Sequence, residues 1–175
     1  APHHTISEAG LVGGGTPFRP GEATLATHGI LFLDEAPEFR RQTIEELACA
    51  VKHGESIGDR GKTSVPVRPQ LVVTLNPCPC GRKGSGSAQK CSCTDQEVSR
   101  YLARAESLTG LTDIQIDMPV LAYSSIKNAA AMPSSAVLQK RVQAARDRMT
   151  ARNPGGVPNG QLTTDQVKGL IGIVG

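Results

Sequence analysis

The chain has 175 residues, enough for one ordinary domain with part of a second. Hydrophobic residues make up 38% of it but aromatic residues only 3%, so a core must be built mainly from aliphatic side chains. The net charge of +3 permits a nucleic-acid partner, and the absence of an apolar run of about 18 residues excludes a membrane-spanning helix of ordinary length. Because the sequence lacks an initiating Met and an export signal, we expect a fragment of a longer cytoplasmic protein.

The first part of the chain predicts a loop region, a strand and a helix. Residues 1–29 are rich in Gly and Pro, which favours loop with a short hairpin. The apolar run 30–33 is typical of a strand buried on both faces of a parallel sheet. A helix ending at Gly54 is expected next, because apolar residues recur at helical spacing at Ile44, Leu47, Ala48 and Val51.

Residues 55–118 predict a hairpin and two more strands. The hairpin covers 55–69, and the apolar run 71–75 is typical of a second buried strand. A loop rich in Cys, Gly and Ser follows at 78–94, and a helix is expected at about 95–104. Residues 114–118 alternate between apolar and polar side chains, which predicts a third strand.

Beyond residue 120 the sequence predicts helices. The Ala-, Arg- and Gln-rich stretch 134–153 favours one helix, and residues 154–161 have the composition of a linker. Thr163 and Gln166 resemble the capped start of another helix. We therefore expect a boundary near residue 120, between an α/β part and a helical part.

Two acidic residues, Asp34 and Glu35, directly follow the first apolar run, which matches the Walker B pattern. The carboxyl end of a buried strand opens on the crevice where α/β sheets bind ligands. There Asp34 would hold Mg²⁺ or its water shell, and Glu35 would polarise the water that attacks ATP. Two solvated acids after a strand explain this pair, taken alone, equally well.

Asn76 follows the next apolar run, so in a parallel sheet it would lie near Glu35. A neutral amide at that place can hold the γ-phosphate or the attacking water without adding charge. The simpler alternative is an Asn-Pro turn after a strand. The two strand-end signals together favour an ATPase core.

Four segments, in this order and at the expected distances, resemble the magnesium-chelatase-like AAA+ ATPases in their ComM (competence protein) branch. They are Pro2–Thr5, Pro20–Glu22 with Leu25–Ala26, Gly29–Glu35 and Asn76–Gly81. The resemblance covers nearly the whole chain, and the Asn-Pro-Cys-Pro-Cys-Gly string is its most specific part.

The resemblance implies an α/β fold: a AAA+ P-loop NTPase core, with a parallel sheet covered by helices on both faces, that lacks its N-terminal part. Residues 1–120 would form this core, with Walker B, a pre-sensor hairpin and sensor 1, and residues 121–175 would begin a helical lid. The implied cofactors are ATP and Mg²⁺, with Asp34 at the Mg²⁺, Asn76 at the ATP phosphates, and catalytic roles for Asp34, Glu35 and Asn76. Because the family forms hexamers and the ComM branch is associated with DNA branch migration, a ring of subunits and a DNA partner are expected.

The chain departs from the family in two places. It holds no G-x-x-x-x-G-K-[ST] loop, which the family carries upstream of Pro2, so the isolated chain is expected to bind nucleotide poorly. Gln115 aligns with an arginine that serves the neighbouring subunit's ATP, and a neutral amide cannot stabilise the transferring phosphoryl group. Either another arginine, such as Arg100 or Arg104, takes that role, or turnover is weak.

Four of the five cysteines form two tight pairs, Cys78-x-Cys80 and Cys91-x-Cys93. In a reducing compartment, clustered thiols are more often metal ligands than disulfides. Four thiolates on a short loop could close a structural Zn²⁺ site that pins a segment with almost no core of its own. Four reduced thiols without a ligand are the alternative. Cys49, on the helix after Walker B, is expected to serve packing.

Arg60 and Lys62 lie at the tip of the predicted 55–69 hairpin. In ring-shaped members of the family this hairpin points into a central pore and touches DNA, so the resemblance implies that the two side chains meet DNA phosphates. An ordinary solvated loop is the alternative.

Three functions are compatible with these features. The leading one is an ATP-dependent AAA+ motor that remodels DNA, as a hexameric helicase in branch migration. The second is a magnesium-chelatase-type ATPase subunit that drives metal insertion into a porphyrin. The third is a catalytically degenerate, zinc-stabilised DNA-binding module.

Overall fold

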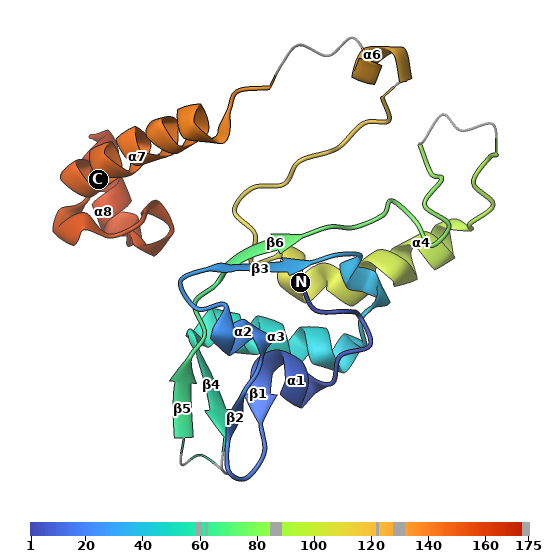
Figure 1. Ribbon diagram of the computed structural model, residues 1–175, viewed down its shortest axis with the longest axis horizontal. Coiled ribbons are helices and arrows are strands. Elements are labelled where there is room, and N and C mark those ends of the chain that lie inside the picture. Colours follow the sequence, from blue (N-terminus) through green and yellow to red (C-terminus); the bar gives the residue numbers. More distant parts are fainter. Residues whose placement is uncertain (59–60, 62, 85–88, 122, 128–131, 173–175) are drawn as a thin grey trace. The chain divides into compact units, whose positions relative to one another are not determined.

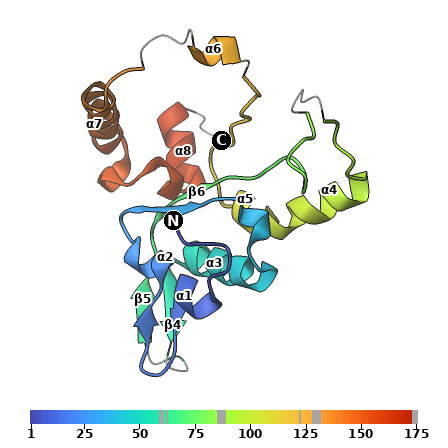
Figure 2. The ribbon, with the colours of Figure 1, turned by 45° about the vertical axis from the view of Figure 1, so that its right-hand side comes forward.

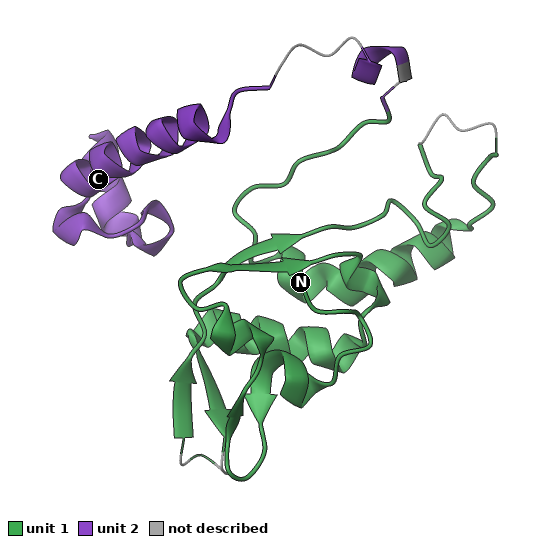
Figure 3. Ribbon diagram, in the orientation of Figure 1, with its two compact units in different colours: residues 1–120 green, residues 121–175 purple. Residues whose placement is uncertain are grey.

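The computed structural model describes residues 1–58, 61, 63–84, 89–121, 123–127 and 132–172. The chain divides into two compact units, Ala1–Val120 and Leu121–Gly175 (Figure 3). The first unit mixes helices with short strands and holds a small parallel sheet, whereas the described part of the second unit is helical. The assignment of these units as AAA+ core and lid stays a prediction.

The N-terminal segment contains two short helices that the sequence did not predict, besides the expected hairpin. Helix α1 (Glu8–Val12) begins at Ser7, whose hydroxyl accepts a hydrogen bond from the Gly10 N–H. Strands β1 (Gly13–Gly14) and β2 (Arg19–Pro20) pair antiparallel, and α2 (Glu22–Leu25) follows. Helices of four or five residues carry too little periodicity for a sequence pattern to reveal them.

The central sheet consists of β3 (Ile30–Leu33) and β6 (Gln70–Val73), which run parallel with Leu33 opposite Val73. Both strands were predicted, but the expected burial on both faces is wrong. Leu31 and Leu33 are buried, whereas Ile30 is 65% exposed. The residues of β6 are alternately exposed and half-buried. The reason is visible in Figure 1, where α1, α2 and α3 lie on the same side of the two strands.

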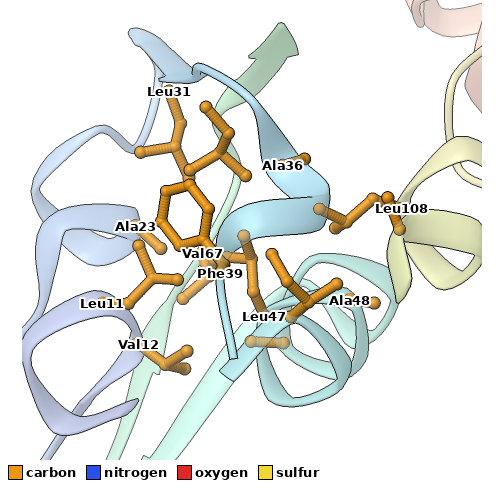
Figure 4. Packing of buried hydrophobic residues seen from close by; sticks show 14 residues of the cluster. Leu11, Val12, Ala23, Leu31, Ala36, Phe39, Leu47, Ala48, Val67 and Leu108 are labelled. Atoms are coloured by element: carbon orange, nitrogen blue, oxygen red, sulfur yellow. The ribbon is translucent and has the colours of Figure 1, made fainter. Parts of the chain in front are cut away.

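Helix α3 (Arg41–His53) follows a 3-10 turn, η1 (Ala36–Glu38), and supplies much of the core. Its buried face carries Ile44, Leu47 and Ala48, as the helical spacing predicted. The helix ends at Gly54, whose φ of 75° is readily adopted by glycine. Figure 4 shows how the aliphatic side chains pack around Phe39, a buried aromatic ring in a core built largely from Leu, Val and Ala.

The predicted 55–69 hairpin is present as β4 (Glu55–Gly58) and β5 (Thr63–Pro66), paired antiparallel. Strand β1 contacts β4, so the two hairpins lie side by side (Figures 1 and 2). The tip residues Arg60 and Lys62 lie outside the described residues.

After the cysteine loop, α4 (Asp95–Leu102) leads through η3 (Ala103–Ala105) into α5 (Glu106–Thr109). The helix predicted at about 95–104 is therefore confirmed, and its N-terminal cap is Thr94. The Thr94 hydroxyl accepts from the Glu97 N–H at 3.2 Å, and the Glu97 carboxylate accepts from the Thr94 N–H at 2.8 Å, a complete capping box.

The prediction of a third strand at 114–118 is wrong. The backbone there is irregular, and the apolar side chains of Ile114, Ile116 and Met118 are between 74% and 85% exposed. A strand needs a neighbouring strand for its N–H and C=O groups, and no described segment of the chain pairs with these residues. Side-chain alternation alone does not supply that partner.

In the second unit, α6 (Tyr123–Lys127) precedes the long helix α7 (Ser135–Arg152), and η4 (Pro154–Gly156), η5 (Asn159–Gln161) and α8 (Thr164–Ile171) follow. The helices predicted at 134–153 and after Thr163 are confirmed. The Asn153 side chain donates to Val157 O at 2.7 Å and so holds the turn after α7. Among the described helices, none combines the length and apolar character needed to cross a membrane.

Candidate active site and cysteine cluster

The carboxyl ends of β3 and β6 bring three polar side chains together: Asp34, Thr74 and Asn76. Because Leu33 lies opposite Val73, the next residues, Asp34 and Thr74, leave the sheet side by side. The Thr74 hydroxyl donates to Asp34 Oδ1 at 2.6 Å and accepts from the Glu35 N–H at 2.9 Å. One hydroxyl group therefore fixes both the Asp34 carboxylate and the backbone of Glu35.

Backbone hydrogen bonds extend this junction beyond the strands. The Thr74 N–H donates to Leu33 O, and the Ala36 N–H donates to Thr74 O, each at 3.0 Å. Between them Glu35 adopts a left-handed conformation with φ 51° and ψ 53°. Non-glycine residues adopt this region infrequently, and such strain is concentrated at functional sites.

Asn76 lies where the sequence predicted it, beside Glu35. Its Nδ2 atom donates to Glu35 Oε1 at 2.9 Å. The amide thus restrains the carboxylate that would polarise the attacking water, while it remains partly accessible itself. Asp34 and Glu35 are both exposed, so a metal ion or phosphate can reach them.

Tyr101 of α4 approaches this site from another element. Its ring is buried, and burial raises the pKa of the phenol. The carboxylates of Glu38 and Glu35 raise it further, and Asn76 acts in the opposite direction. The phenol therefore stays protonated at neutral pH.

The four paired cysteines lie together in the structure. Their sulfur atoms are all within 4.8 Å of one another. The Cys78–Cys80, Cys80–Cys91 and Cys78–Cys91 sulfur pairs are 3.4, 3.6 and 3.7 Å apart. A tetrahedral site with Zn–S distances of about 2.3 Å has its sulfurs about 3.8 Å apart. The donor set and its spacing therefore fit Zn²⁺.

The thiols of this cluster differ strongly in acidity. Burial raises the pKa of Cys78, but hydrogen bonds from the Lys83 backbone and from the Cys80 and Cys91 thiols outweigh it and lower that pKa to about 6. For Cys93 a backbone hydrogen bond from Cys80 acts downward, but the neighbouring thiols and burial raise the pKa to about 12. A metal ion bound to these thiols would replace their protons.

Gln115, which aligns with the family's arginine, and the two arginines that could replace it lie at different places in the structure. Gln115 is exposed and donates to Thr109 O at 3.4 Å. Arg104 donates to the carbonyl oxygen of Pro37, two residues after Glu35, at 3.5 Å, whereas Arg100 is exposed on α4. A part in phosphoryl transfer stays a prediction for Arg100 and Arg104.

Comparisons with known proteins identify the family to which the chain belongs. The sequence profile of the family described as magnesium chelatase, subunit ChlI, matches residues 1–126. The chain belongs to the magnesium-chelatase family. The family expected from the four sequence segments is thereby confirmed, and with it the coarse inference of a AAA+ ATPase relationship.

Several curated relatives of this magnesium-chelatase family member are known. The chain is 36% identical to the competence protein ComM of Haemophilus influenzae over 96% of its length, and 38% identical to the uncharacterized protein YifB of Escherichia coli over 87%. It is 35% identical to an uncharacterized protein of Mycobacterium tuberculosis over 98% of its length. The chain spans about a third of the length of these relatives, since it covers 33%, 30% and 33% of them.

The sequence analysis did not identify two residues at or near this site, Thr74 and Tyr101. Thr74 could have been found, because it precedes Asn76 by two residues and alternate residues of a strand share a face. Tyr101 had no such signal, because its burial depends on how α4 packs after the cysteine loop. The positions of Asp34, Glu35, Asn76 and the cysteines followed from local patterns alone.

Proposed function

We propose that this chain carries the metal-binding and water-activating side of the ATP site of a AAA+ motor. In this proposal Asp34 holds Mg²⁺ or its water shell, Glu35 polarises the attacking water, and Asn76 orients Glu35 and contacts the γ-phosphate. The observation that supports it most is the hydrogen-bonded set Thr74–Asp34–Glu35–Asn76 at the ends of two parallel strands. Two unrelated solvated acids would not need such restraint.

Membership of the magnesium-chelatase family supports the same proposal. The phosphate-gripping loop is not among these 175 residues, so tests of turnover need the full-length protein. ATP and Mg²⁺ are the proposed cofactors.

We further propose that the motor acts on DNA, as a ring of subunits in DNA remodelling or branch migration. Similarity to a protein named for competence supports this, together with the net positive charge and the basic pair Arg60 and Lys62 between β4 and β5. The expected partners are therefore DNA and further copies of the chain.

Zn²⁺ at the four cysteines is proposed as a structural cofactor. The spacing of the sulfur atoms supports it. The cluster begins two residues after Asn76 and ends just before the capping residue of α4, so a bound metal would fix both ends of a loop that borders the acidic site.

ATP turnover by the full-length protein, with and without branched DNA, tests the proposal. We expect Mg²⁺-dependent turnover that DNA stimulates, and a weaker stimulation when Arg60 and Lys62 are both replaced by Ala. Lys52→Ala, an exposed substitution on α3, is the matched control. Turnover stimulated only by chelatase partner subunits would favour metal insertion, and DNA binding without turnover would favour the binding module.

A further inference from the structure

Helix α7 of the second unit (Figure 1) carries more positive charge than the chain has as a whole. It holds five basic residues and one acidic residue, so its formal charge of +4 exceeds the chain's net +3, and the rest of the chain is slightly acidic. A polyanion that is attracted to this chain should therefore be attracted to this helix above all. The basic residues are Lys140, Arg141, Arg146, Arg148 and Arg152.

Three of these arginines lie along one face of α7. Arg148 follows Arg141 by seven residues and Arg152 follows Arg148 by four, so the three fall within about 40° of one another around the helix axis. We call this set the arginine stripe. At about 1.5 Å of rise per residue it is about 16 Å long. Arg146 lies about 140° away from the middle of the stripe, on another face.

The positive charge of the arginine stripe is exposed and not neutralised. All three side chains are exposed, and α7 contains no buried residue. No carboxylate in the described part of the chain lies within ion-pair distance of them. The acid of the helix, Asp147, lies about 120° away from the stripe and accepts from Gln143 Nε2 at 2.8 Å. The stripe is therefore free to bind an anion from outside the chain.

Arg152, at the end of the stripe, is held in place by neutral partners. Its Nε atom donates to Asn153 Oδ1 at 3.0 Å, and its Nη2 atom donates to Asn159 Oδ1 at 2.6 Å. Asn153 is buried and is fixed in turn, because its Nδ2 atom donates to Val157 O and to Asn159 Oδ1. A guanidinium held by amide oxygens keeps its full charge and has less freedom to lose when it binds a phosphate.

We propose that the arginine stripe of α7 binds the phosphate backbone of DNA, as a second contact besides Arg60 and Lys62. The phosphates of one strand of a duplex are about 3.4 Å apart along its axis, so the stripe spans about five of them. Helix α7 has no aromatic side chain on which a base could stack, so the contact is independent of base sequence. The inference rests on the proposed function, because it takes DNA as the partner.

Single alanine variants of the full-length protein test the inference. The dissociation constant for a short labelled DNA duplex is measured between about 50 and 200 mM salt. Arg141→Ala and Arg148→Ala should each lower the slope of log Kd against log salt by about 0.9, because each removes one phosphate contact. Arg146→Ala removes the same charge from another face of α7 and should change the slope by less than about 0.3. Alanine favours a helix, so the thermal unfolding midpoint should not fall in any of the three.

The comparison among the variants decides the inference, and the wild type decides the proposed function. Equal changes of slope in all three variants would show an effect of overall charge, not of the stripe, and would overturn the inference. Unchanged DNA binding in Arg141→Ala and Arg148→Ala would overturn it as well, and a simultaneous loss of self-association would assign the stripe to an acidic surface of another subunit. A wild type that does not bind DNA would overturn the proposed action on DNA, and this inference with it.

Discussion

The Thr74 hydroxyl donates a 2.6 Å hydrogen bond to Asp34 Oδ1, between residues that are 40 positions apart in the chain. The same oxygen accepts from the Glu35 N–H, so it must stay in one orientation to satisfy both groups. This contact sets the direction of the carboxylate proposed to hold Mg²⁺. It therefore predicts how the metal requirement of the full-length protein depends on Thr74.

Thr74→Val keeps the shape of the side chain and removes both hydrogen bonds. We expect the Mg²⁺ concentration for half-maximal ATP turnover to rise about threefold to tenfold, and unfolding to become easier by about 1–3 kcal/mol. Thr74→Ser keeps the hydroxyl and should resemble the wild type. Equal Mg²⁺ requirements for the Val and Ser variants would show that Thr74 does not position Asp34.

Replacing cluster cysteines should remove a bound metal. We expect the purified full-length protein to lose about one zinc ion per chain on Cys78→Ser or Cys91→Ser, measured by elemental analysis, and to unfold several degrees earlier. Cys49→Ser, outside the cluster on α3, should keep the metal. Zinc content that is the same in the Cys78 and Cys49 variants would rule out this site.

The capping box of α4 predicts a pH-dependent contribution to stability. Hydrogen bonds from the Thr94 N–H and hydroxyl lower the pKa of Glu97 in the folded chain. A lowered folded pKa means that the stabilisation is present above the unfolded pKa, about 4.3, and is lost as the pH falls through the folded value. Glu97→Ala should therefore be less stable than wild type in urea unfolding at pH 7, and the difference should shrink at pH 3. A difference that persists unchanged at pH 3 would mean that the carboxylate charge is not responsible.

The close packing around Gly21 predicts that a larger residue there would destabilise the fold for steric reasons. A Cβ atom there would overlap the backbone of Gly13 and come within 2.7 Å of Leu11 O, where the β1–β2 hairpin passes α1. Because backbone atoms cannot move aside, Gly21→Ala should lower the free energy of unfolding by about 1–3 kcal/mol or more. Gly169→Ala, on α8 with open space around it, should be neutral or stabilising by up to about 1 kcal/mol. A Gly21→Ala protein as stable as wild type would contradict the packing described at this hairpin.

The sequence predicted those elements whose signals are local. The apolar runs at β3 and β6, the spacing along α3 and the acidic pair at Asp34 and Glu35 each depend on neighbouring residues only, and all are present in the structure. The proximity of Glu35 and Asn76 also followed, because parallel strands end at the same edge of a sheet.

The features that the sequence did not predict depend on distant partners. Residues 114–118 alternate like a strand, but no described segment pairs with them, so the pattern alone was misleading. The open face of the small sheet, with Ile30 exposed, likewise depends on which helices cover it. The burial of Tyr101 likewise depends on how α4 packs against the rest of the first unit, which no local pattern encodes.

Hydrolysis and binding of ATP by the Glu35→Gln full-length protein, measured side by side, test the central claim most directly. Gln keeps the size of the side chain but cannot take a proton from water, so we predict Mg²⁺-dependent ATP binding within about threefold of wild type and turnover lowered by a factor of about 10² to 10⁴. Glu45→Gln, an exposed carboxylate of α3 that pairs with Arg41, should leave both values unchanged. Turnover of Glu35→Gln equal to that of wild type would contradict the claim that Glu35 activates the attacking water.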